Sequence, residues 1–199
     1  MKKGLLIIIS GPSGVGKGTI RKRVMDDPSL NLWFSVSMTT RPIRPGEMNG
    51  REYYFVSDDE FNAQVARGNL LEHAVFVGHQ YGTPLDKLEI MRNEGKNVIL
   101  EIDVNGTEQV LEKCKEERPV TFFIVPPSFA ALEARIRGRS TESEDVIEER
   151  LSKAAHEMDL RSCYKYVIEN DDVTRAVIEI QSIIREEIHN RSISKPSII

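Results

Sequence analysis

The sequence has 199 residues, of which 40% are hydrophobic and 29% are charged. A chain of this length buries about 70–75% of the surface that it would expose when unfolded, so it needs no disulfide or structural metal to fold. Its net charge of −4 disfavours a duplex-binding protein, because such proteins normally present a basic face. We therefore expect no nucleic-acid partner.

Cysteine usage and hydropathy favour a cytoplasmic protein. Cys114 and Cys163 fit neither a CxxC pair nor a metal-ligand spacing, which indicates reduced thiols. The apolar run after Lys2 and Lys3 is shorter than the roughly 7–15 apolar residues of a signal peptide. No segment approaches the ~20 apolar residues of a membrane span, so no membrane association is expected.

The first informative stretch is a buried strand followed by a glycine-rich loop. Residues 5–9 are all aliphatic, which is typical of a parallel strand covered on both faces. Residues 11–17 match the phosphate-binding pattern G-x-x-x-x-G-K. Glycines allow successive backbone N–H groups to point at phosphate oxygens, and a helix that starts at this place aims its positive end at the same anion.

The alternative is an ordinary turn with Lys17 on the surface, but the strand before the loop and the helix after it are the context that the motif requires. The residues expected to bind ATP here are Gly11, Ser13, Gly14, Val15, Gly16, Lys17, Gly18 and Thr19. Gly18 stands where Ser or Thr usually offers a hydroxyl to Mg²⁺, which leaves direct ligation of the metal by the loop open. Lysine followed by Gly-Thr resembles the adenylate kinase type of nucleoside monophosphate kinase.

A helix is expected to continue to about residue 25, and residues 32–37 read as a second strand. Residues 37–55 then contain two prolines and two glycines, which exclude a regular helix. Arg41 and Arg44 lie on this locally basic loop, and arginine presents a fork of donors that suits a phosphate monoester. By themselves, these arginines could equally be solvated surface residues.

The two stretches together resemble the guanylate kinase family. The resemblance rests on GPSGVGK at residues 11–17 and on Ser37-x-Thr39-Thr40-Arg41-Pro42-x-Arg44-x-Gly46-Glu47-x-Asn49-Gly50-x-x-Tyr53. It continues through Glu72, residues 81–83, residues 101–103 and residues 139–143. The likeness covers nearly the whole chain, up to about residue 191.

The resemblance implies an α/β fold, with a P-loop kinase core whose parallel sheet is covered by helices, an inserted GMP-binding lobe and a helical lid. It implies one guanylate kinase-like domain over residues 1–190. The core would comprise residues 1–36, 84–134 and 163–190, the GMP-binding lobe residues 37–83, and the lid residues 135–162. Residues 191–199 are expected to form a disordered tail.

The resemblance also assigns roles. The phosphate of GMP would be held by Arg41, Arg44, Tyr53 and Tyr81, and the guanine by Ser37, Glu72, Thr83 and Asp103. The alternative for the two tyrosines is packing in a core. Arg135 and Asn170 would join the ATP site, and the catalytic residues would be Lys17, Arg41, Arg139 and Arg150.

Further elements follow in chain order. Ser57 and Glu60 have the spacing of a capping box, which predicts a helix that ends near Gly68. A strand over 70–77, a turn over 79–82 and a helix over 85–93 are expected next. Beyond them we expect a helix over 108–116, a strand over 120–125, a helix with Phe129, Leu132 and Ile136 on one face, a strand over 166–168 and a helix from Val173.

Residues 97–103 predict a buried parallel strand that ends in two acids. Glu101 and Asp103 would share a face of that strand, and ligands of open parallel sheets bind beyond the carboxyl ends of strands. Two carboxylates near a triphosphate suit an Mg²⁺ ion that is held through its waters. The alternative is a strand that ends in solvent.

The predicted function is Mg²⁺-dependent transfer of a phosphoryl group from ATP to GMP, and also to dGMP, with the chain as a monomer or homodimer. One rival is a kinase of another phosphorylated acceptor, which Glu72 and Thr83 disfavour. The other rival is a non-catalytic guanylate kinase-like binding module, which the intact loop with Lys17 disfavours.

Overall fold

The computed structural model describes residues 2–138 and 143–193. The chain divides into two compact units, one with Met1–Ile8 and Leu32–Pro119 and the other with Ile9–Asn31 and Val120–Ile199. Strand β1 (Leu6–Ser10) begins in the first unit and ends in the second. This division differs from the domain organisation that the sequence suggests, because residues 37–83 group with part of the expected core and residues 135–162 with the rest.

A parallel sheet forms the apolar centre of the first unit. Its strands run in the order β2 (Leu32–Phe34), β7 (Asn97–Glu101), β1, and β2 is parallel to β7. Helices α3 (Leu85–Asn93) and α4 (Val104–Lys113) contribute Leu88 and Val110 to the same buried cluster as Ile8 and Leu100. Strands that are apolar on both faces are what a sheet covered by helices requires.

The strand of residues 97–103 is shorter than the sequence predicts, and the next helix begins earlier. Strand β7 ends at Glu101, and α4 begins at Val104 instead of residue 108. The reason is that the Asp103 side chain accepts a hydrogen bond from the Gly106 N–H at 2.9 Å and so caps α4. Asp103 therefore does not share a strand face with Glu101, and that part of the prediction is wrong.

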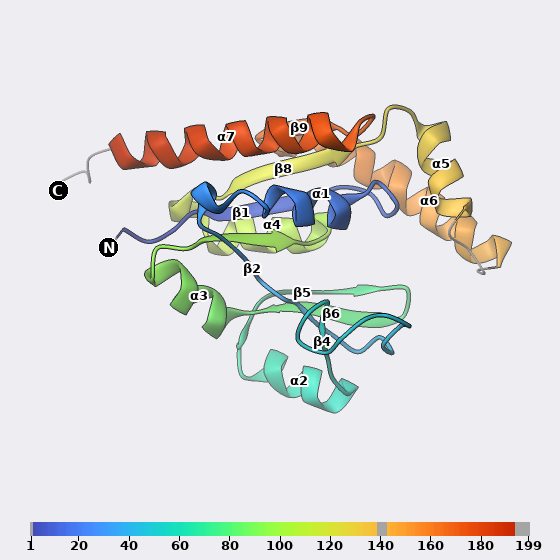
Figure 1. Ribbon diagram of the computed structural model, residues 1–199. Helices are drawn as coiled ribbons and strands as arrows, with labels where there is room; N and C mark the ends of the chain where they lie inside the picture. The colour runs from blue at the N-terminus through green and yellow to red at the C-terminus, as the bar shows by residue number, and fades with distance from the viewer. Residues whose placement is uncertain (1, 139–142, 194–199) are drawn as a thin grey trace. The chain divides into compact units, whose positions relative to one another are not determined.

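A second sheet of the first unit has four strands, in the order β4 (Tyr54–Phe55), β3 (Met38–Thr39), β6 (His79–Pro84) and β5 (Leu70–Phe76). Helix α2 (Asp58–Ala66) contacts β5 and follows the predicted capping box (Figure 1). The Ser57 hydroxyl accepts from the Glu60 N–H at 3.2 Å, and the Glu60 carboxylate accepts from the Ser57 N–H at 2.9 Å.

The turn expected over residues 79–82 is wrong, because these residues lie in β6. The chain turns instead at Val77 and Gly78, whose φ angles are 47° and 72°, and Phe76 pairs with His79 across the hairpin. Two consecutive positive φ angles fit a tight hairpin turn. The sequence hides this turn because a β-branched residue rarely adopts a positive φ.

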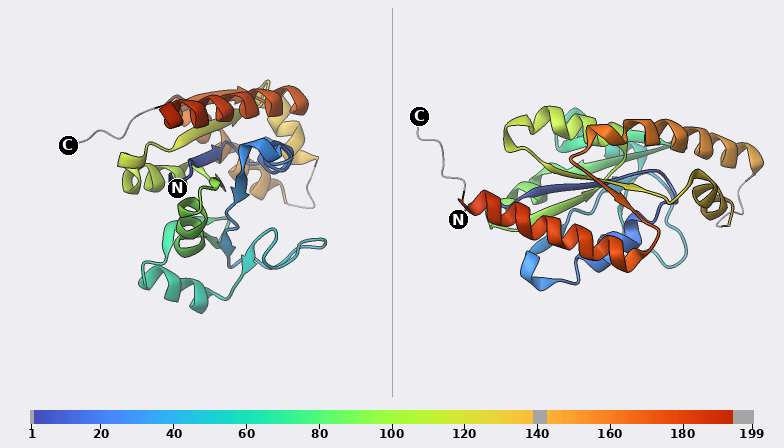
Figure 2. Two further views of the ribbon diagram at one scale, coloured as in Figure 1. Left: turned by 60° about the vertical axis from the view of Figure 1, so that its left-hand side comes forward. Right: turned by 90° about the horizontal axis from the view of Figure 1, so that it is seen from above.

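In the second unit, β8 (Val120–Val125) pairs in parallel with β9 (Tyr166–Glu169), in the order β1-β8-β9. In the described residues of this unit, the α-helices are α1 (Lys17–Val24), α5 (Phe129–Arg137), α6 (Glu144–Asp159) and α7 (Val173–Ile193). The long helix α7 contacts α1 and β9 (Figure 1), and α5 contacts α6 (Figure 2).

Of the three residues expected on one face of α5, Leu132 and Ile136 are buried and Phe129 is 43% exposed. One expectation for these helices needs correction. Helix α7 runs to Ile193 and so enters the segment that we expected to be a tail. Within residues 2–138 and 143–193, no helix is long and apolar enough to cross a membrane.

Candidate active site

The phosphate-binding loop of the second unit connects β1 to α1, which begins at Lys17. Gly11, Gly14 and Gly16 have φ angles of 140°, 86° and 101°. A Cβ atom on Gly16 would lie 2.7 Å from Nδ2 of Asn170, and one on Gly11 would lie 2.4 Å from the carbonyl oxygen of Ile124. The loop therefore needs glycine at these positions both for its backbone conformation and for space.

Positive charge gathers on this loop from two elements. The Lys17 ammonium folds back over the loop and donates to the carbonyl oxygens of Gly11 and, at 3.1 Å, of Pro12. Arg150, on α6, donates from Nη2 to the hydroxyl of Ser13 at 2.7 Å. Arg139, the other arginine expected here, lies outside the described residues.

A pocket of about 430 Å³ lies beside the loop. Arg135 and Asn170 both line it. Arg135 donates to the Asn170 carbonyl at 3.1 Å, and the Asn170 amide donates to the Val15 carbonyl at 2.7 Å. Among the described residues, Oδ1 of Asn170 is buried without a hydrogen-bond partner. The residues that line the pocket are Gly14, Val15, Gly16, Thr19, Arg135, Gly138, Asn170 and Val173. Gly138 and Val173 were not among the residues predicted for this site.

A buried carboxylate is the main feature of the first unit. Glu72, on β5, is 3% exposed, and the Thr83 hydroxyl of β6 donates to its Oε1 at 2.6 Å. Burial raises the pKa of Glu72 to about 7; the charge of Asp103 adds to the rise, while the Thr83 hydrogen bond and the charge of Lys113 oppose it. The carboxylate thus sits in a site that suits a neutral group or a carboxylate bound to donors.

Gly106, which the sequence analysis did not single out, lies close to the carboxylates of Glu72 and Asp103. A Cβ atom there would stand 2.6 Å from Oε2 of Glu72 and 3.5 Å from Oδ1 of Asp103. The first turn of α4 thus approaches the Glu72 carboxylate so closely that only glycine leaves it in place. No sequence signal indicated this role, because Gly106 precedes the helix expected over residues 108–116, and helices normally disfavour glycine.

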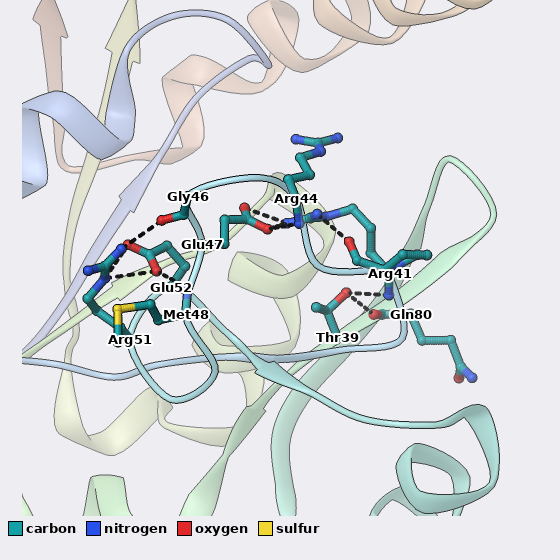
Figure 3. Close-up of polar contacts among 10 residues, drawn as sticks. Thr39, Arg41, Arg44, Gly46, Glu47, Met48, Arg51, Glu52 and Gln80 are labelled. Carbon is teal, nitrogen blue, oxygen red and sulfur yellow. Dashed lines mark hydrogen bonds and ion pairs between the residues drawn. The ribbon is translucent and has the colours of Figure 1, made fainter.

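Three residues that we expect to bind the acceptor phosphate lie together in the first unit, namely Arg41, Tyr53 and Tyr81. The Arg41 guanidinium carbon lies 5.5 Å from the ring centroid of Tyr53, and the rings of Tyr53 and Tyr81 are 5.8 Å apart. Burial, with a smaller contribution from the charge of Glu101, raises the pKa of Tyr53 to about 12. Figure 3 shows that the Arg44 side chain points away from the Arg41 guanidinium.

The structure therefore groups the predicted residues into two sets. Every described residue expected to bind ATP belongs to the second unit, and every residue expected to bind GMP or metal belongs to the first. Within residues 2–138 and 143–193, no three His, Cys, Asp or Glu side chains lie together as a complete metal site.

Residues 3–187 match the family model for guanylate kinase. The chain belongs to the guanylate kinase family. The resemblance that the motifs suggested, and the P-loop α/β fold that it implied, are thereby confirmed.

Relatives in the guanylate kinase family are close in sequence. The guanylate kinase of Mesoplasma florum is 51% identical over 185 residues, which cover 93% of this chain and 62% of the relative. That of Lactobacillus acidophilus is 47% identical over 93% of this chain and 90% of the relative. This chain thus spans 62% of the length of the Mesoplasma protein.

A solved structure supports the same assignment. The crystal structure of guanylate kinase from Anaplasma phagocytophilum matches with a TM-score of 0.78 at 34% identity. The match covers 94% of this chain and 87% of that chain. The guanylate kinase fold therefore extends over both units of the molecule.

Proposed function

We propose that this guanylate kinase-family chain transfers the terminal phosphoryl group of ATP to GMP, and also to dGMP, giving ADP and the nucleoside diphosphate. The observation that carries the proposal is the carboxylate of Glu72. It is almost fully buried and is hydrogen-bonded to Thr83, beside Asp103. A buried acid is costly unless it has a partner, and a ligand can be that partner.

Guanine has the donors that such a carboxylate needs. Its N1–H and N2 amino group are two adjacent donors that match the two oxygens of Glu72. Adenine offers an acceptor at N1 in the same place, and a bidentate contact discriminates between bases by about 1–3 kcal/mol. Ser37, Thr83 and Asp103 are the further guanine contacts that we propose.

The acceptor phosphate is assigned to Arg41, Arg44, Tyr53 and Tyr81. The guanidinium groups supply charge-assisted hydrogen bonds, and the raised pKa of Tyr53 keeps its hydroxyl protonated at neutral pH, so that it remains a donor. The acceptor phosphate is already anionic, so no general base is required for its attack.

On the donor side, the loop amides and Lys17 would bind the ATP phosphates, and Asn170 and Arg135 would line the nucleotide pocket. Phosphoryl transfer asks the protein mainly to position the reactants and to stabilise charge. Lys17, Arg41, Arg139 and Arg150 are the residues to which we assign that stabilisation.

Mg²⁺ is the cofactor that we propose. An Mg²⁺ ion is usually held by one or two carboxylates, by substrate phosphates and by water, so the missing three-residue cluster in the described part of the chain is compatible with it. Glu101 and Asp103 have the hard oxygen donors that would hold it through its waters. The ion would supply positive charge to the phosphates.

The test is the release of ADP with GMP, AMP, UMP or CMP as the acceptor. We expect turnover with GMP far above that with the other three, and none when magnesium is chelated. GMP binding without any ADP release would support a binding module instead. Equal turnover with GMP and AMP would remove Glu72 as the determinant of base choice.

Lys17→Ala tests the donor side of the proposal. We expect turnover to fall by roughly 10²–10³, the range for the loss of one charge-stabilising contact. Circular dichroism should be unchanged, because Lys17 donates to the carbonyl groups of Gly11 and Pro12 within its own loop. An unfolded variant would mean that Lys17 has a structural role.

A further inference from the structure

The loop that carries Arg41 and Arg44 also carries a carboxylate to which the proposed reaction gives no role. Glu47 accepts from Nη2 of Arg41 with both oxygens, at 2.8 and 3.0 Å (Figure 3). Its Oε2 also accepts from the backbone N–H of Arg44 at 2.8 Å. One side chain therefore contacts both arginines that we assign to the acceptor phosphate.

These contacts hold the Arg41 guanidinium in one place. Its side chain is 8% exposed, and Pro42 accepts from its Nη1 at 2.7 Å. The ring of Tyr53 lies beside it at 5.5 Å and that of Phe55 at 5.6 Å. A guanidinium has five N–H donors, more than the contacts with Glu47, Pro42 and Tyr81 use, so donors remain for an anion.

Glu47 also closes the turn on which Arg44 lies. The Glu47 N–H donates to the Arg44 carbonyl at 3.1 Å, while the Glu47 carboxylate accepts from the Arg44 N–H. Burial raises the pKa of Glu47, but the hydrogen bonds from Arg41 and from the Arg44 amide outweigh it, so the net pKa lies below its ordinary value. A phosphate that displaced this ionised carboxylate would remove the hydrogen bond that the carboxylate accepts from the Arg44 N–H.

We propose that Glu47 is a positioning residue for the acceptor phosphate: it fixes the Arg41 guanidinium beside Tyr53 and shapes the turn that presents Arg44. It remains bound to Arg41 when the phosphate binds and does not compete with it. The inference rests on the proposed function, because it assigns the acceptor phosphate to these arginines. It predicts an effect on the phosphate of GMP and none on the guanine.

The experiment compares GMP with guanosine, which has the base but lacks the phosphate. Glu47→Gln should weaken the calorimetric Kd for GMP by about tenfold, the scale of one lost charge-assisted hydrogen bond, and leave that for guanosine within about twofold. In steady-state kinetics the KM for GMP should rise, while the KM for ATP should not change.

The same loop supplies a matched control. Glu52 accepts from the Met48 N–H and from Arg51, and so closes the neighbouring part of the loop (Figure 3). Glu52→Gln removes one carboxylate from the loop and should leave GMP binding within about twofold. In an Arg41→Ala background, Glu47→Gln should have a smaller effect than in the wild type, because the contact with Arg41 is already lost and only the contact with the Arg44 N–H remains.

Two outcomes of the binding comparison would overturn the inference. Tighter GMP binding by Glu47→Gln would mean that Glu47 competes with the phosphate, and an equal loss for guanosine would mean that it only maintains the fold. If Glu47→Gln does not fold, Glu47→Asp, which keeps the charge, takes its place. This variant must weaken GMP binding more than guanosine binding, although its loss of GMP affinity should be smaller than that expected for Glu47→Gln. A wild-type protein that binds GMP but transfers no phosphoryl group would contradict the proposed reaction alone, since the binding comparison would remain valid.

Discussion

The proton of Glu72 links the proposed guanine site to pH. Its pKa is raised from 4.5 to about 7, so the folded protein holds a proton there that the unfolded chain releases at lower pH. Between these two values the folded state binds more protons, and its stability therefore falls as pH rises through this window. Guanine favours the ionised form, because its donors need both carboxylate oxygens.

This linkage predicts that guanosine affinity rises with pH up to about 7 and is constant above it. Below pH 7 the ionised fraction falls about tenfold per unit, and the apparent Kd rises in proportion. Calorimetry with guanosine avoids the titration of the GMP phosphate, which has a pKa of about 6. Proton release on binding at pH 6, absent in Glu72→Gln, would verify it; a flat affinity profile from pH 5.5 to 8 would contradict it.

The space beside Glu72 gives a second prediction for a single residue. Gly106→Ala favours the helix by up to about 1 kcal/mol, but its Cβ would lie 2.6 Å from Oε2 of Glu72 and must displace the carboxylate. We expect guanosine binding to weaken by roughly tenfold or more, without a loss of thermal stability. Asn105→Ala, on an exposed neighbour, is the control, and unchanged guanosine binding by Gly106→Ala would mean that the carboxylate has room to move.

The glycines of the loop and of the helix that follows it differ in backbone conformation and in the space around them. Gly16 has a φ of 101° and lies against Asn170, whereas Gly18 lies inside α1 and has no positive φ. Gly16→Ser should therefore raise the KM for ATP at least tenfold, because the side chain meets both strain and the Asn170 amide. Gly18→Ser should be tolerated, since it restores the common pattern of the motif; a loss of turnover equal to that of Gly16→Ser would contradict this distinction.

The elements that the sequence predicts well are those with a local physical cause. The capping box at Ser57, the helix over residues 85–93 and the strand over residues 120–125 all lie where the pattern indicates. The failures occur where a side chain acts on a neighbouring backbone or where a residue adopts a rare conformation. Asp103 caps a helix instead of extending a strand, and Val77 takes a positive φ.

The residues of the candidate site likewise fall into those that a local pattern predicts and those that it does not. The loop from Gly11 to Lys17 follows from composition and spacing alone, whereas Glu72 and Thr83 acquired a role only through the family resemblance. Their hydrogen bond joins two strands of a hairpin and depends on a register that no local pattern specifies. Gly106 and Glu47 emerge only once side-chain positions are known.

At the scale of the whole molecule, the residues that we propose for the two substrates belong to different units. Glu72, Thr83, Arg41 and Tyr53 belong to the unit of Met1–Ile8 and Leu32–Pro119, and the phosphate loop to the other. A ligand that binds one unit stabilises it by RT ln(1 + [L]/Kd), about 2.7 kcal/mol at a hundredfold excess over Kd. Local openings in the unit that holds the ligand should therefore become rarer.

Hydrogen exchange measures this directly, because amide protection reports the free energy of local opening. GMP alone should slow exchange in β5, β6 and the first turn of α4, and a non-hydrolysable ATP analogue should slow it in the phosphate loop and α1. Glu72→Gln should abolish the first effect and leave the second unchanged. If GMP alone protects the phosphate loop as strongly as it protects β5, the two units do not bind their substrates separately, and the assignment of one substrate to each unit is wrong.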